Sequence, residues 1–179
     1  GKVDTTFTVS GWNGDDSETE DGAAGTEPTI SLADEVQITA TQGGNIQIGS
    51  STRWSTDQLT HMGTGGFYNG ASVDSYLTST LTNEIELGSN VTLRAPEGLI
   101  GIGTSTNSVT TSDSDSYTFG FVGGSSSDAS NTMTSDQSVL INDSARLHAG
   151  RDIVVTAGHN PLTQENSLID IYAIVTARC

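Results

Sequence analysis

Six aromatic residues of this chain lie in two segments that are otherwise rich in glycine, serine and threonine. They are Phe67, Tyr68, Tyr76, Tyr117, Phe119 and Phe121. Aromatic rings in such segments either bind a sugar or a protein partner, or fasten the segment onto the rest of the fold. Because Phe67 and Phe121 stand in two matching Gly-Phe pairs, we favour fastening over ligand binding.

Acidic residues are concentrated in the segments 14–22 and 112–116. Asp113 and Asp115 alternate with serine there, and carboxylate oxygens are ligands that Ca²⁺ prefers. Neither segment has the spacing of an EF-hand loop or of the nonapeptide calcium repeat. We interpret both as charged, solvated loops, keep Asp113 and Asp115 as weak calcium candidates, and expect no other cofactor.

A further polar group comprises Arg94, Arg146 and His148, which the internal repeat places in neighbouring outward columns. A polysaccharide lyase would need such a base beside bound calcium, and a glycoside hydrolase would need paired carboxylates. No acid stands at a matching spacing. We interpret the three residues as a solvated basic patch and expect no catalytic residues, with a polysaccharide-acting enzyme as the alternative.

Three segments of the chain share one pattern of short apolar strands separated by polar corners. They read TISLADEVQITATQGGNIQIG (29–49), EIELGSNVTLRAPEGLIGIG (84–103) and SVLINDSARLHAGRDIVVTAG (138–158). The chain therefore divides into a repeat of about 54 residues, over 29–83, 84–137 and, in part, 138–179. The predicted core consists of the apolar residues at alternate positions: Ile30, Leu32, Val36, Ile38, Ile46, Ile48, Ile85, Leu87, Val91, Leu93, Ile100, Ile102, Val139, Ile141, Leu147, Ile153 and Val155.

This pattern predicts an all-β right-handed parallel β-helix, or β-solenoid, with three strands per coil and a long insertion after the third strand. One coil cannot bury its apolar face, but stacked coils can. We expect 142–158 to stack on 88–103 and on 168–177, and each insertion to form a hairpin or a small extra layer. An antiparallel sandwich would also explain the alternation, but not the shared period.

The segment 145–158 resembles a known family. Its sequence, ARLHAGRDIVVTAG, is similar to the AGrDI-ltAg repeats of filamentous-haemagglutinin-like bacterial exoproteins and giant surface adhesins. NVTLRAPEGLIGIG and EVQITATQGGNIQIG look like weaker copies. The resemblance implies a secreted or surface-displayed β-helical stalk that serves adhesion or scaffolding, and it carries no catalytic residues. The long insertions depart from the compact coils of that family.

Composition and charge limit the partners of the chain. It has 179 residues, a net charge of −16 and one cysteine, Cys179, so no disulfide can form within it. The negative charge disfavours nucleic acid and anionic membranes, and no segment has the length of a membrane span. Because the chain begins at Gly1 and ends after an apolar run, we expect one solenoid segment, 1–179, of a longer protein.

We expect this segment to be extracellular, at the cell surface, and structural or adhesive. In this interpretation it forms a rigid rod or a fibre and presents its loops for binding. Its expected partners are neighbouring coils of the parent protein or identical subunits end to end, together with a host-surface protein, a matrix protein or a glycan.

Overall fold

The chain forms an all-β structure. The computed structural model describes residues 5–15, 25–26 and 29–178, and no helix occurs among them. The strands in chain order are β1 (Thr5–Asp15), β2 (Gly25–Thr26), β3 (Thr29–Leu32), β4 (Gln37–Thr39), β5 (Ile46–Leu87), β6 (Thr92–Ala95), β7 (Ile100–Ile141), β8 (Arg146–Ala149), β9 (Ile153–Ala157), β10 (His159–Asn160), β11 (Glu165–Asn166) and β12 (Leu168–Arg178). Two of them, β5 and β7, are each 42 residues long.

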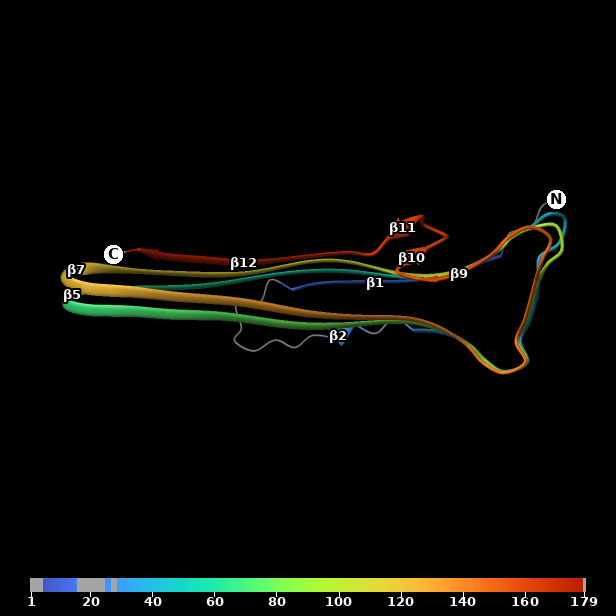
Figure 1. Ribbon diagram of the computed structural model, residues 1–179, viewed down its shortest axis with the longest axis horizontal. Coiled ribbons are helices and arrows are strands. Elements are labelled where there is room, and N and C mark those ends of the chain that lie inside the picture. The colour runs from blue at the N-terminus through green and yellow to red at the C-terminus, as the bar shows by residue number, and fades with distance from the viewer. Residues whose placement is uncertain (1–4, 16–24, 27–28, 179) are drawn as a thin grey trace.

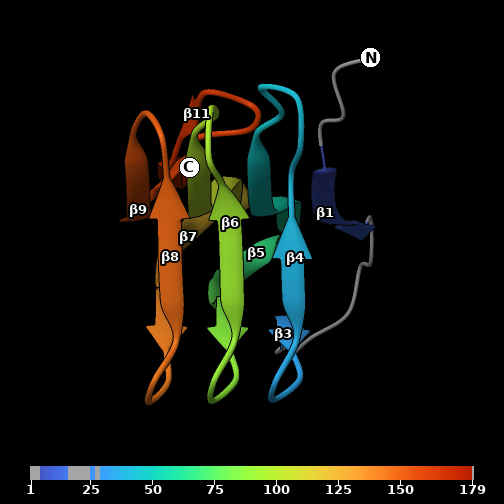
Figure 2. The same ribbon diagram turned by 90° about the vertical axis from the view of Figure 1, so that its right-hand side faces the viewer.

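The two long strands pair with each other in parallel and in register. Ile46 lies beside Ile100 and Leu87 lies beside Ile141, with one break in the pairing at Phe67. Strands β1 and β12 extend this sheet on either side, and β4, β6 and β8 form a second parallel sheet. Figure 2 shows the three strands of the second sheet side by side, each contributed by a successive repeat. This arrangement is compatible with a β-solenoid.

Each long strand runs out to one end of the molecule and returns. We call 46–66 and 100–120 the outgoing halves, 67–87 and 121–141 the return halves, and the bend between them the tip (the left end of Figure 1). The two halves of each insertion lie against each other, as in the Ser116–Ser126 contact, but they are not paired as an antiparallel hairpin. The third predicted strand, the insertion and the first strand of the next repeat are one continuous strand, because its backbone pairs with the next repeat and not with itself.

The last strand does not lie where the sequence pattern placed it. The segment 142–158 does stack on 88–103, through the pairing of β8 with β6 and of β9 with the start of β7. Strand β12, however, pairs with 107–117 of β7, not with 142–158. The chain leaves the sheet after β9, forms the small antiparallel β10–β11 hairpin, and rejoins β7 farther along. This excursion shifts the register away from the common period.

The hydrophobic core lies at the end of the molecule opposite the tip. It includes Ile46, Ile48, Ile85, Ile100 and Ile102, all fully buried, and partly buried residues such as Leu32, Val36, Ile38, Val139 and Leu147 pack against it. In the third repeat the matching residues are half-exposed: Ile141, Ile153 and Val155. Ile153 is 45% exposed because no described strand lies on its outer side.

The polar corners of the repeats share one backbone conformation. Glu35, Asn90 and Ser144 occupy equivalent corners, and all three have a positive φ, near 60°. Gly150, in the AGRDI segment, lies at a second corner. A side chain does not fit there, because a Cβ at Gly150 would overlap the carbonyl oxygen of Pro96 in the preceding repeat. The corners thus bring successive repeats close enough for their backbones to bond.

The interior of the long strands is lined by hydroxyl groups on one side. The inward residues of the outgoing halves are mostly serine and threonine, and they are buried against the return halves. The Ser112 hydroxyl donates to the Ser75 carbonyl oxygen at 3.1 Å, whereas the Oγ1 atoms of Thr104 and Thr106 have no hydrogen-bond partner in the structure. A buried hydroxyl without a partner costs free energy of folding.

We predict that Thr104→Val raises the free energy of unfolding by about 1 kcal/mol, because it replaces an unpartnered buried hydroxyl by a methyl group of the same shape. The matched control, Ser112→Ala, should lower it by about 1 kcal/mol because it removes a bonded hydroxyl. Urea denaturation followed by the fluorescence of buried Trp54 measures both. Destabilisation by both variants alike would contradict this account of the interior.

Candidate functional site

Five of the eight phenylalanine and tyrosine residues gather near the tip. They are Phe67, Tyr68, Tyr117, Phe119 and Phe121. Four of them are exposed, and Tyr117 is partly buried. Tyr76, the sixth predicted aromatic residue, lies farther along the return half of β5. An exposed aromatic cluster on a surface otherwise rich in serine, threonine and acids is a typical recognition surface.

Phe67 and Phe121 stack on each other. Their ring centroids lie 5.5 Å apart with an interplanar angle of 5°, and the Tyr68 ring packs edge-on against Phe67 at 4.9 Å. The two phenylalanines are 63% and 83% exposed, so they do not fasten the insertion onto the core. The pairing is broken at Phe67, but the Gly66–Gly120 and Tyr68–Val122 pairs keep the register on either side, so the two rings still contact each other.

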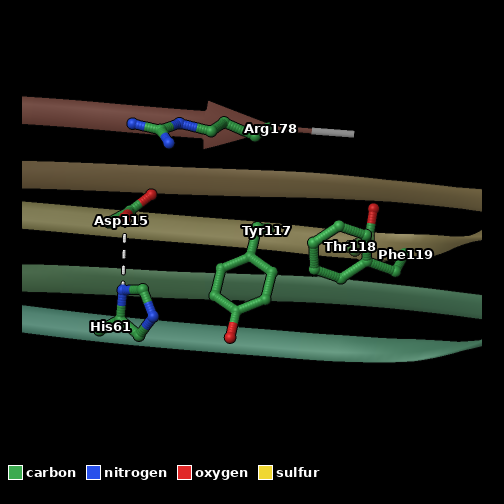
Figure 3. A pocket seen from close by; sticks show the side chains of 6 residues that line it. All are labelled: His61, Asp115, Tyr117, Thr118, Phe119 and Arg178. Carbon is green, nitrogen blue, oxygen red and sulfur yellow. Dashed lines mark ion pairs between the residues drawn. The ribbon is translucent and has the colours of Figure 1, made fainter.

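A surface pocket of about 530 Å³ lies beside this cluster. It crosses three neighbouring strands, with residues from β5, β7 and β12, and Figure 3 shows their side chains. The lining residues are His61, Asp115, Tyr117, Thr118, Phe119 and Arg178. The register explains this grouping, because His61 lies beside Asp115 and Arg178 lies beside Tyr117.

The polar and aromatic groups of the pocket contact each other. His61 Nδ1 lies 3.3 Å from Asp115 Oδ2, and the His61 ring lies 5.1 Å from the Tyr117 ring. Tyr117 in turn packs edge-on against Phe119 at 5.3 Å. Tyr117 leans across Gly63 on the neighbouring strand, where a Cβ would overlap the phenol ring. A glycine at 63 is therefore what allows Tyr117 to form the wall of the pocket.

Tyr76 has a different environment. The charge of Asp74, followed by that of Asp128, raises the pKa of Tyr76 above its ordinary value because both charges oppose formation of the phenolate, and the hydrogen bond to Asp128 acts in the same direction. Asp74 and Asp128 lie side by side on the return halves, and the Tyr76 hydroxyl lies 3.5 Å from Asp128 Oδ2. The raised pKa favours the protonated phenol in the folded state, so its contribution to stability is full below the ordinary pKa and is lost at higher pH.

The calcium candidates lie on one strand and on the same side of it. Asp113 lies beside Leu59 and Asp115 beside His61, so neither has an acidic residue opposite it on β5. Within the described ranges, no group of three or more histidine, cysteine, aspartate or glutamate residues could hold a metal ion. Residues 16–22 of the other acidic segment, and Cys179, lie outside the described residues.

The predicted basic patch forms on the second sheet. Arg94 lies directly beside His148, and Arg146 lies beside Thr92. All three side chains of the patch are exposed. They lie away from the pocket, which contains none of them.

Sequence reasoning missed His61, Gly63 and Arg178. The first two could have been found by adding the repeat length, because 54 residues separate His61 from Asp115 and Gly63 from Tyr117. Arg178 could not have been found in this way, because the β10–β11 excursion changes the register of β12. A histidine beside an aspartate and a glycine beneath a tyrosine are the signals that pairwise alignment of repeats would have shown.

Comparison of this chain with known protein families, with curated proteins and with solved structures finds no match. Any proposal about function must therefore rest on how the residues of this chain are arranged. Among the described residues, no helix has the length and apolar character needed to cross a membrane.

We predict that Gly63→Ala displaces the Tyr117 ring from His61. Nuclear Overhauser contacts between the two rings, which lie 5.1 Å apart, should then disappear from the NMR spectrum. Gly65→Ala is the matched control, because a Cβ there meets only the Phe119 carbonyl oxygen, at 3.7 Å. Ring contacts that survive in Gly63→Ala would show that the pocket does not depend on this glycine.

Proposed function

We propose that this chain is a segment of a right-handed parallel β-helix with three strands per coil at the end opposite the tip, and that its function is structural and adhesive. In this proposal it belongs to a secreted or cell-surface bacterial protein, forms part of a rigid rod or an extracellular fibre, and presents its tip to other molecules. The observation that carries the proposal is the pairing of β5 with β7 along their length. Successive repeats support one another, as a rod requires.

The open edge of the third repeat supports assembly. Ile153 and Val155 pair with Ile100 and Ile102, which are fully buried, yet they themselves are 45% and 41% exposed. They occupy core positions with a neighbouring repeat on one side only. An uncovered edge with apolar inward residues readily pairs with another strand. The proposed occupant is a neighbouring coil of the parent protein or the first repeat of an identical subunit.

The charge of the chain supports an extracellular location and the absence of nucleic-acid partners. A net charge of −16 repels phosphate backbones and anionic membranes, and it keeps a long rod soluble. The exposed aromatic cluster at the tip supplies the surface for binding. A polysaccharide-acting enzyme is the alternative function, and it would need paired carboxylates or a base beside calcium. No contact at the pocket favours that chemistry over binding.

We predict that the purified chain associates end to end through this edge. Electron microscopy and size-exclusion chromatography, at low and high calcium, should reveal elongated particles. Ile153→Lys should prevent this association, because a charge that points inward at an edge strand opposes pairing. Thr111→Lys, at an outward position of β7 between β5 and β12 and so away from any open edge, is the control and should assemble like the unaltered chain.

Two results would contradict the assembly proposal. One is single compact particles of the unaltered chain at every concentration tested. The other is equal assembly by Ile153→Lys and Thr111→Lys, with both variants retaining the circular dichroism spectrum of β structure.

A further inference from the structure

The pocket at the tip combines two kinds of wall. Tyr117 and Phe119 provide aromatic surface, and Phe119 is 71% exposed. His61, Asp115 and Arg178 provide hydrogen-bonding groups around them, as Figure 3 shows. A concave site with aromatic surface and a few convergent polar groups is the usual form of a small-ligand site. Its volume, about 530 Å³, lies within the range of such sites.

The charges around the pocket favour a neutral ligand. Arg178 is positive and Asp115 is negative, so the two formal charges of the lining cancel when His61 is neutral. A polyanion would meet Asp115 and the net charge of the whole chain, −16. A cationic side chain would meet Arg178. Within the lining, a ligand charge of either sign therefore meets one like and one opposite charge, so the pocket itself gives a charged ligand no net electrostatic advantage over a neutral one.

The hydrogen-bonding capacity of the pocket is both donating and accepting. The guanidinium of Arg178 only donates, the carboxylate of Asp115 only accepts, and the imidazole of His61 can do either. A ring of hydroxyl groups can satisfy all three, since each hydroxyl both donates and accepts. A pyranose sugar carries such hydroxyls around its edge and presents C–H groups on its faces, which pack against aromatic rings.

We propose that this pocket binds a neutral pyranose unit of a glycan. The sugar packs against Tyr117 and Phe119, and its hydroxyls bond to Asp115, His61 and Arg178. The stacked pair Phe67 and Phe121 lies farther along the tip and extends the aromatic surface for a second sugar unit. This inference rests on the proposed function, in which the tip is the surface that recognises other molecules.

Saturation-transfer NMR on the full chain tests the proposal. The probes are the methyl glycosides of glucose, galactose, mannose and N-acetylglucosamine, each in separate samples. We expect transfer to at least one of them. Tyr117→Ala and Phe119→Ala should each weaken binding by about tenfold, because each removes one aromatic contact. Tyr76→Ala, whose ring is exposed and does not line the pocket, is the control and should bind like the unaltered chain.

Three results would overturn the proposal. The first is no transfer to any of the four glycosides, and the second is equal binding by Tyr117→Ala, Phe119→Ala and the unaltered chain. The third is binding of heparin or an arginine-rich peptide in place of the neutral sugars. Phe119→Ala keeps the test decisive if Tyr117→Ala fails to fold, because Phe119 is largely exposed. Assembly through the edge of the third repeat is measured independently. If the chain assembles but binds no sugar, only the sugar site is overturned. If it binds sugar but does not assemble, only the assembly proposal is overturned.

Discussion

The hydrogen-bonded pairing of Ile46–Leu87 with Ile100–Ile141 is the interaction on which the rest of the structure depends. Apart from the break at Phe67, every residue of this parallel ladder lies beside its equivalent in the next repeat, about 4.8 Å away. The consequences are visible along the whole strand. Ile46 stacks on Ile100 in the core, Ser51 on Ser105 at the start of the outgoing half, and Phe67 on Phe121 at the tip. One register therefore determines the core, the polar interior and the aromatic cluster at the tip together.

The two ends of the molecule use this register differently. Near the corners, the ladder stacks isoleucine, leucine and valine, and burial of apolar surface stabilises the fold. Along the outgoing halves it stacks small hydroxyl residues, whose burial contributes less and leaves Thr104 and Thr106 without hydrogen-bond partners. Toward the tip, the backbone bonds between repeats continue, and Ala71 and Val73 of the return half are still buried. The pocket from His61 to Arg178 lies there, and it is lined mostly by outward side chains together with the buried Thr118.

The sequence predicted the corners well and the long strands poorly, for a physical reason. Alternating isoleucine, valine and leucine indicate burial directly, so the pattern predicts strands around Ile38, Leu93 and Leu147, and the second sheet contains them. Serine and threonine at alternate positions carry no such signal. The pattern therefore predicts a strand, an insertion and a second strand where the structure has one continuous strand of 42 residues. The pocket was predicted only in part. Tyr117 and Phe119 were singled out by type, but Arg178 reaches them through a change of register that no period describes.

Double spin labelling measures the register most directly. Cysteines introduced for labelling at Ser72 and Ser126, which lie side by side on the outer face of the return halves, should hold two labels on backbones about 4.8 Å apart. In a Cys179→Ser background, the electron paramagnetic resonance spectrum should then show strong spin–spin interaction. Labels at Ser72 and Ser130, four residues out of register, should interact much more weakly. Equal interaction in the two pairs, or none in the first, would contradict the in-register stacking of repeats.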